Sequence, residues 1–233
     1  MAILSFEAAV LGNDEVAPSI YILKLQCPED FDFKPGQWLN VLLQKDGKPY
    51  GRPYSIASHA SEKGSFQLCL KRVPSGYVSN YLSDLKTGEK VAIKGPFGVF
   101  LLKEPFEKDI IFIATGTGVA PFVPMVQEVL SKSPNSKVWL FFGVRHDEDV
   151  FYREFFEGLE KQYPNFKFIV TLSKPSPQWK GEQGYVQHLL AKNFSDGNNK
   201  QIYICGLPKM VEEVQAAALQ LGIPKEKVYL EKY

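Results

Sequence analysis

Cysteine and histidine are scarce in this chain, and their scarcity excludes several kinds of site. The three cysteines, Cys27, Cys69 and Cys205, stand far apart in the sequence. So sparse and odd a set does not form a disulfide framework, and no CxxC or four-cysteine run is present to hold an iron–sulfur cluster. The three scattered histidines do not indicate a zinc site. We therefore expect no metal site, a reducing compartment and hence a cytoplasmic location.

The chain also lacks a large excess of charge of either sign and has no long apolar segment. The formal net charge is +1, which gives no reason to expect nucleic acid or an anionic membrane as a partner. The longest apolar run, at 110–114, has the length of a strand and not of a membrane span. The first ten residues lack the pattern of a signal peptide, so none is expected. The hydrophobic content of 45% is enough to build a core in one large domain or two modest ones.

The first hundred residues alternate short β-like runs with turns that contain glycine and proline. This rhythm predicts an antiparallel barrel or sandwich. One segment, at 76–85, differs because its apolar residues have helical spacing. The expected strands lie at 3–10, 20–27, 37–44, 66–72 and 90–95.

From residue 109 onwards, continuous apolar runs alternate with helical segments. Such alternation is typical of a parallel sheet covered by helices on both faces, here with five strands. The boundary is expected in the polar stretch at 103–108, which gives domains of residues 1–104 and 105–233. The expected strands are 109–115, 137–143, 166–173, 201–206 and 227–233, and the expected helices are 119–131, 150–162, 185–192 and 208–221.

Residues suited to ligand binding lie at or just beyond the ends of all five expected parallel strands. Ligands of open parallel sheets bind beyond the carboxyl ends of the strands. In TGTGVAP at 115–121, two glycines let backbone N–H groups approach a phosphate at a helix start. Each residue alone also has an ordinary structural explanation, such as a tight turn, a surface charge or a small buried thiol. Their convergence on one edge is the stronger argument. The residues are Gly116, Gly118, Gly143, Arg145, Ser173, Cys205, Gly206 and Glu231.

The stretch GRPYSIAS at 51–58 places one charge within a strand-like run. If 50–57 form a strand, Arg52 and Tyr54 share a face at a spacing of about 6.5–7 Å. A cation and an aromatic ring so arranged suit a ligand with a phosphate and a flat ring. Simple alternation places Ser55 on the other face. The competing interpretation is a barrel strand with a core tyrosine and a solvated arginine.

The motifs together resemble those of the ferredoxin–NADP reductase family. GRPYSIAS is similar to the R-x-Y-S flavin signature of that family, and the other matching motifs follow in the family's order along nearly the whole chain. The resemblance implies an antiparallel β-barrel that binds flavin, followed by an α/β domain that binds a nicotinamide nucleotide. The matching motifs are LCLKR (68–72), GYVSNYL (76–82), GPFG (95–98), GTGVAP (116–121), CGLPKM (205–210) and the terminal EKY (231–233).

The resemblance also implies roles for individual residues in the flavin site. Arg52 neutralises the flavin pyrophosphate, Tyr54 packs on one face of the isoalloxazine ring, and Ser55 hydrogen-bonds near flavin N5. The start of the 76–85 helix offers further donors to the pyrophosphate. The implied flavin-binding residues are Arg52, Tyr54, Ser55, Lys71, Gly76, Tyr77, Val78 and Ser79.

Other roles implied by the resemblance concern the coenzyme and the chemistry. Cys205 lies by the nicotinamide ring, Glu231 serves in a proton or hydrogen-bond relay, and Tyr233 covers the second flavin face until nicotinamide displaces it. Together with Ser55, these are the residues expected at the reacting atoms. The implied coenzyme-binding residues are Gly116, Thr117, Gly118, Pro121, Gly143, Arg145, Ser173, Cys205, Gly206 and Met210.

The cofactor implied by the resemblance is FAD, with FMN as the less favoured choice, and the substrate is NAD(P)H. The segment between Arg72 and Gly76 is only VPS, whereas plant-type relatives carry a longer insertion there that supplies an adenine-stacking aromatic. Arg145 could meet the 2′-phosphate of NADPH. The loop at 143–152 is similar to that of NADH-using oxygenase reductases, and its acidic residues at 147–149 would repel a phosphate that they faced.

The function implied by the resemblance is flavin-dependent oxidation of NAD(P)H, with electrons passed to a separate ferredoxin or oxygenase component. One alternative is an NAD(P)H:flavin reductase that uses free flavin as a substrate, which WKGEQG at 179–184 resembles. Another is a flavin-binding electron-transfer subunit of a larger complex. The terminal EKY and CGLPKM favour the first interpretation.

Overall fold

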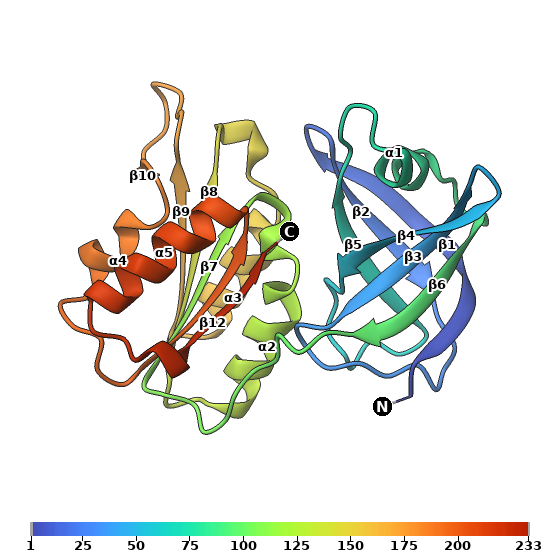
Figure 1. Ribbon diagram of the computed structural model, residues 1–233. Helices are drawn as coiled ribbons and strands as arrows, with labels where there is room; N and C mark the ends of the chain where they lie inside the picture. The colour runs from blue at the N-terminus through green and yellow to red at the C-terminus, as the bar shows by residue number, and fades with distance from the viewer. Residues whose placement is uncertain (1, 233) are drawn as a thin grey trace. The chain divides into compact units, whose positions relative to one another are not determined.

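The structure is a computed structural model that describes residues 2–232. The chain folds into two compact units (Figure 1). One comprises the residues up to Leu102 together with Ala120–Met125, and the other comprises Lys103–Val119 and the residues from Val126 on. Among residues 2–232, none of the helices combines the length and the apolar character that a membrane crossing requires.

The first unit is a six-stranded antiparallel barrel, so the barrel and not the sandwich is confirmed. Its strands are ordered β4-β3-β6-β1-β2-β5. The two outer strands of that order meet where Ile56 pairs with Leu68 and where the Ala57 N–H donates to the Gln67 carbonyl at 2.8 Å. This contact closes the barrel and ends β4 beside Ser55. The strands are β1 (Leu4–Ala17), β2 (Ile20–Gln26), β3 (Trp38–Lys45), β4 (Lys48–Ser55), β5 (Ser65–Lys71) and β6 (Lys90–Phe97).

Alternating side chains of these strands fill the barrel with one apolar core. Four phenylalanines form its largest aromatic group, with ring centroids 5.3–6.4 Å apart. Helix α1 (Tyr77–Asp84) packs Val78 and Leu82 into the same core, so the helix expected at 76–85 is confirmed. Burial of these side chains fixes the start of α1 relative to the barrel. The aromatic group consists of Phe6, Phe31, Phe33 and Phe66.

The second unit is a parallel sheet with helices on both faces. The strand order is β10-β9-β8-β7-β11-β12, and all its pairings are parallel. Helices α4 and α5 cover one face and α3 covers the other (Figure 1). The elements are β7 (Asp109–Thr115), α2 (Phe122–Lys132), β8 (Lys137–Val144), α3 (Arg153–Gln162), β9 (Phe166–Leu172), β10 (Glu182–Gln183), α4 (His188–Asn193), β11 (Lys200–Gly206), α5 (Pro208–Gln220) and β12 (Val228–Lys232).

The parallel sheet has six strands, so the expectation of five was wrong. The extra strand, β10, contains two residues, and Glu182 and Gln183 pair with Thr171 and Leu172 of β9. Neither residue is apolar, so no hydrophobic run indicated a strand here. The strand is held by its pairing with β9 and by a local bond from Trp179 Nε1–H to the Glu182 carbonyl at 2.9 Å. The stretch WKGEQG therefore shapes the edge of the sheet.

Turns of 3₁₀ helix lie next to several strand ends. One, η1 (Gly116–Val119), follows β7 directly, so the helix expected at 119–131 begins only at Phe122. Two others are η2 (Asp147–Asp149) and η3 (Lys225–Lys227). Short 3₁₀ turns tighten a connection. Here η1 keeps the glycines of TGTGVAP at the end of the sheet.

Replacing two glycines of the second unit by alanine should change the stability of the protein in opposite directions. A Cβ added at Gly197, which is buried, would lie 2.2 Å from the backbone of both Gly222 and Ile223. Gly158 lies exposed within α3, and a Cβ there meets nothing within 4 Å. We expect Gly197→Ala to lower the free energy of unfolding by about 1–3 kcal/mol. Gly158→Ala should raise it by up to about 1 kcal/mol. Denaturant unfolding of the apoprotein measures both, and equal effects would contradict the packing shown here.

Candidate functional site

In the first unit, the candidate residues begin on β4. Arg52 and Tyr54 are two positions apart on this strand and therefore share a face. Arg52 is exposed, and its guanidinium donates to the Gly51 carbonyl at 2.8 Å and to the Tyr50 hydroxyl. Neither of these two partners of Arg52 is a carboxylate. The guanidinium is thus presented to solvent with its charge available to an anion.

Tyr54 is half-buried and packs against the barrel core. Burial raises the pKa of its hydroxyl to about 12, and the nearby Arg52 charge offsets this only in part. The phenol therefore stays neutral, and the ring is held as a fixed flat surface beside a cation. Ser55 ends the strand and is half-buried.

The start of α1 offers backbone donors to a ligand. Gly76 is the N-cap and makes no side-chain capping bond, so the first N–H groups of the helix lack the partner that a cap would provide. A Cβ at Gly76 would lie 2.4 Å from both Ser79 Oγ and a methyl group of Val73. Glycine is therefore required by space. Ser79 is buried and accepts the Val73 N–H at 3.3 Å, so its hydroxyl braces this turn.

Two residues beside Arg52, namely Tyr50 and Lys45, were not predicted from the sequence. The Arg52 guanidinium carbon lies 4.1 Å from the Tyr50 ring centroid. The Tyr50 ring in turn meets the Tyr77 ring at 5.8 Å and 75°. Lys45 Nζ lies 5.4 Å from the centroids of both rings. Nothing in the linear pattern indicates this group, because it joins the β3–β4 hairpin to α1.

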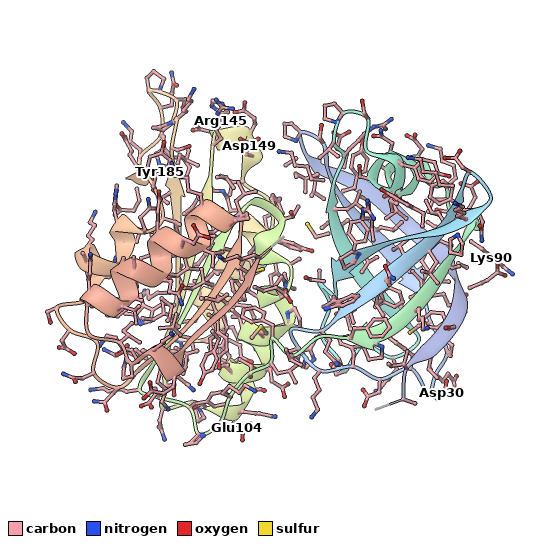
Figure 2. The ribbon with its side chains drawn as sticks, viewed as in Figure 1. Asp30, Lys90, Glu104, Arg145, Asp149 and Tyr185 are labelled. Atoms are coloured by element: carbon pink, nitrogen blue, oxygen red, sulfur yellow. The ribbon has the colours of Figure 1, made fainter. Side chains whose placement is uncertain are left out.

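In the second unit, the carboxyl ends of the parallel strands meet at one edge of the sheet. Figure 2 shows Arg145 and Asp149 at that end, with Tyr185 beside them, whereas Glu104 lies at the opposite end. The convergence expected from the sequence is therefore present.

Lys71, another predicted flavin-binding residue, is an exposed residue at the end of β5 in the first unit.

The end of β7 forms a small cradle around Thr115. A Cβ at Gly206 would lie 2.6 Å from Thr115 Oγ1 and 2.6 Å from Met210 Cε, and one at Gly143 would lie 3.1 Å from Thr115 Cγ2. Thr115 Oγ1 is buried and has no hydrogen-bond partner among residues 2–232. A buried hydroxyl without a partner is costly, so a ligand that bonds to it gains affinity. Thr115 begins the TGTGVAP segment but was not among the residues predicted to bind a ligand.

The glycine turn after β7 lies at the same edge. Gly116 has a left-handed φ of 53°, and Gly118 is buried. Thr117 is half-buried between them, and Pro121 is buried just before α2. This turn can bring backbone N–H groups close to a phosphate.

Two of the three acidic residues of the loop after β8 accept hydrogen bonds from neighbouring protein groups. Asp147 accepts hydrogen bonds from the Ser176 N–H and hydroxyl, both at 2.9 Å, and the Ser176 backbone is the main cause of its lowered pKa. Asp149 accepts the His146 N–H at 2.9 Å. Arg145 is exposed. Ser173 is exposed one residue beyond β9, with its N–H donated to the Val144 carbonyl at 3.1 Å.

Cys205 and Glu231 are register partners on β11 and β12. Burial raises the pKa of the Cys205 thiol, and the Glu231 charge raises it further. The thiol is therefore neutral and acts as a small apolar surface. Burial raises the pKa of Glu231 to about 7, so its carboxyl group can hold or release a proton at neutral pH. Tyr233, the last residue named by the sequence analysis, lies outside the described residues.

These features fit the two kinds of ligand that the sequence indicated. The first unit offers a cation, a flat ring and a helix start, which suit a flavin nucleotide. The second offers a glycine turn and an orphaned hydroxyl at the carboxyl edge of a parallel sheet, which suit a nicotinamide nucleotide.

Comparison with known families agrees with this division. Residues 7–101 match the model of the oxidoreductase FAD-binding domain, and residues 112–216 match that of the oxidoreductase NAD-binding domain. Each match falls on the unit whose geometry suits that ligand.

Known proteins resemble the chain over nearly its whole length. It is 33% identical to ferredoxin–NADP reductase B of Sorangium cellulosum, over 98% of this chain and 97% of that protein. It is 31% identical to the phenol hydroxylase P5 protein of Acinetobacter pittii, over 98% of this chain and 65% of that protein. The crystal structure of a cytochrome P450 reductase from Amycolatopsis superposes with a TM-score of 0.92 at 26% identity, covering 99% of this chain and 70% of that one.

The face of β4, the carboxyl edge of the parallel sheet, the two domain matches and the full-length relative all point the same way. The chain uses FAD as cofactor and NAD(P)H as substrate. It therefore belongs to the ferredoxin–NADP reductase family of flavin-dependent NAD(P)H oxidoreductases.

Proposed function

We propose that the chain passes the electrons of NAD(P)H to a separate one-electron acceptor, a ferredoxin or an oxygenase component. The names of its relatives support this choice, since they include a ferredoxin–NADP reductase, a phenol hydroxylase component and the electron transfer component of a toluate 1,2-dioxygenase from Pseudomonas putida. The chemistry that FAD supplies is acceptance of a hydride and release of its two electrons one at a time.

The first unit holds the flavin through the β4 face and the start of α1. Arg52 binds the pyrophosphate, and Gly76, Tyr77, Val78 and Ser79 add donors from α1. Tyr54 lies against the isoalloxazine ring, and Ser55 hydrogen-bonds near N5. Lys71 adds a positive charge at the end of β5. The observation that carries this assignment is the exposed Arg52 guanidinium, which contacts no carboxylate within residues 2–232, on the same face as the half-buried Tyr54.

The second unit holds the coenzyme at the carboxyl edge of its sheet. Gly116, Thr117 and Gly118 bind the phosphates with their backbone, and Pro121 ends that turn. The outer end of the coenzyme lies by Arg145 and Ser173. The nicotinamide end lies by Gly143, Cys205, Gly206 and Met210. Glu231 relays a proton, and Tyr233 is the residue that covers the second flavin face.

Thr115 joins this set because its hydroxyl is buried at this edge and has no hydrogen-bond partner among the described residues. The carboxamide of nicotinamide carries both a donor and an acceptor. A hydrogen bond between the two would orient the ring without moving the backbone. A side chain at residue 206 would crowd this hydroxyl, because its Cβ would lie 2.6 Å from Thr115 Oγ1.

The proposal is tested by following reduction of the FAD-loaded protein in a stopped-flow instrument. We expect rapid bleaching of flavin absorbance with NADH or NADPH, followed by reoxidation when a [2Fe–2S] ferredoxin is added. Protein that purifies without flavin and shows a rate that saturates with added free flavin would support the flavin-reductase alternative. Protein that keeps its flavin but is not reduced by either coenzyme would support the non-catalytic subunit alternative.

Replacement of Thr115 by valine should weaken coenzyme binding without lowering the stability of the fold. Thr115→Val removes a buried hydroxyl without a protein partner, so the free energy of unfolding should stay the same or rise. The dissociation constant for NAD(P)⁺ should increase about fivefold, the value of one net hydrogen bond. Isothermal titration and denaturant unfolding measure the two effects.

The matched control for Thr115 is Thr171→Val. The Thr171 hydroxyl is buried and donates to the Gly184 carbonyl at 3.0 Å. Its removal should lower the free energy of unfolding by about 1 kcal/mol and leave coenzyme affinity unchanged. Loss of stability in Thr115→Val with unchanged affinity would show that the Thr115 hydroxyl is only structural.

Glu231 should make the stability of the protein depend on pH. Its pKa is about 7 in the folded chain and 4.5 without burial, so the folded state binds the proton more tightly. Between these values the protein therefore loses stability as pH rises, by at most about 3 kcal/mol. Glu231→Gln should remove this loss, so the variant gains more over the wild type at pH 8 than at pH 5. Glu226→Gln, an exposed carboxylate in η3, is the control. A constant difference across pH would contradict the burial of Glu231.

A further inference from the structure

Asn13, in the polar second half of β1, has no part in the roles given above. Its side-chain amide nitrogen donates to three backbone carbonyls, those of Leu82 at 2.9 Å, Ser83 at 3.2 Å and Leu85 at 3.0 Å. All three carbonyls belong to the last turn of α1 or to its C-cap. The bonds join residues 69 to 72 positions apart in the chain. Asn13 therefore fastens the end of α1 to the wall of the barrel.

A bulge in β1 turns Asn13 toward the helix. Leu11 is an extra residue in the strand, because the pairing with β2 shifts by one position between Val10 and Gly12. Such an extra residue moves every later side chain to the opposite face. Asn13 consequently pairs with Leu23, whose side chain is buried in the barrel core, and shares its face. In an unbroken alternation from the buried Val10, Asn13 would point outward.

The end of α1 lacks the caps that most helices use. The last carbonyls of a helix have no partner within the helix, and many helices end on a left-handed glycine or a basic side chain. Helix α1 has the extended Leu85 at its C-cap and no basic residue in its last turn. The Leu85 N–H reaches the Leu82 carbonyl only at 3.4 Å. Asn13 supplies donors to this end from a distant strand.

The Asn13 side chain makes these bonds while its own oxygen stays unpaired. Its Oδ1 is buried and has no hydrogen-bond partner among residues 2–232. A buried acceptor without a partner lowers the stability of the fold. Local rules of this kind are broken mainly at positions that serve a site. The three carbonyl bonds thus indicate a role for the amide beyond filling space in the barrel.

The opposite end of α1 is the one that meets the flavin phosphates in the proposed site. The helix has eight residues, so its two ends are only about 12 Å apart. A helix so short is not stable alone and keeps its place through tertiary contacts. Val78 and Leu82 hold one face of it in the core, and Asn13 holds its carboxyl end. Fraying or tilting of that end would redirect the N–H groups that follow Gly76.

We propose that Asn13 is a positioning residue for the flavin phosphates. By binding the carbonyl end of α1, it directs the uncapped N–H groups at the other end toward the phosphate. This rests on the proposed role of α1 in flavin binding. Asn13 acts through the helix, so its loss should affect flavins that carry a phosphate and spare those that carry none.

The experiment compares FAD, FMN and riboflavin on the apoprotein of the full chain. Asn13→Ala should raise the dissociation constants for FAD and FMN by about 3- to 30-fold, the range for an anion at a helix start. The constant for riboflavin, which has no phosphate, should stay within about twofold of the wild type, because the dipole acts only on charge. Quenching of flavin fluorescence measures all three constants. Asn13→Leu, which fills the space of the amide, gives the same comparison if the alanine variant does not fold.

The matched control is Asn165→Ala. The Asn165 amide also donates to a distant carbonyl, that of Ser136 at 2.8 Å, but both residues lie in the second unit. Its loss should lower the free energy of unfolding and leave all three flavin constants unchanged.

Two results with Asn13→Ala would overturn the proposal. Equal weakening of all three flavins would show that the amide only supports the fold, and unchanged constants would show that the end of α1 needs no such bond. Failure of the proposed flavin site appears differently, in the wild type itself. Riboflavin would then bind as tightly as FMN, because no phosphate would be held.

Discussion

Within residues 2–232, each unit leaves polar groups without a side-chain or hydrogen-bond partner where an element begins or ends. A helix start has N–H groups that no preceding turn can pair, and α1 makes no side-chain cap at Gly76. At the end of β7, the Thr115 hydroxyl is buried without a partner among the described residues. Under the proposed function, a nucleotide that pairs with these groups gains affinity, most of all at the buried Thr115 hydroxyl.

Closure of the barrel determines where the first of these groups lies. Ile56 pairs with Leu68 and thereby turns the chain away from β3 just after Ser55. Val78 and Leu82 of α1 are buried in the same core. The helix start and the Arg52 face are thus both fixed to one rigid body. A site built on such a body needs little rearrangement to bind its ligand.

The sequence predicted most of the fold because its signals are local. The apolar run at 109–115 is β7 with the same bounds, and the helical spacing at 76–85 is α1. Strand β1 was expected to end at residue 10 but continues to Ala17. Its second half is the polar segment GNDEVA, which is a strand only because it pairs with β2. Strand β10 was missed for the same reason.

The residues of the candidate site likewise include some that local sequence signals predict and others that only tertiary contacts reveal. Residues at strand ends were predictable because all parallel strands present their carboxyl ends at one edge. The pKa of Glu231 was not, since it depends on burial that the sequence near the terminus does not show. Tyr50 and Lys45 were also missed, because a hairpin and a helix 25 or more residues apart bring them to Tyr77.

The loop after β8 shows how tertiary contacts change the meaning of a charge pattern. Three consecutive acidic residues suggest a surface that repels a phosphate. In the structure Asp147 accepts hydrogen bonds from Ser176 of the loop after β9, and Asp149 accepts one from the His146 N–H of its own loop. Arg145 and Glu148 remain as exposed charges of opposite sign. Hydrogen bonds from these neutral donors hold the two carboxylates in place without removing their negative charge, so the structure changes where the charges of Asp147 and Asp149 point and not how acidic the loop is.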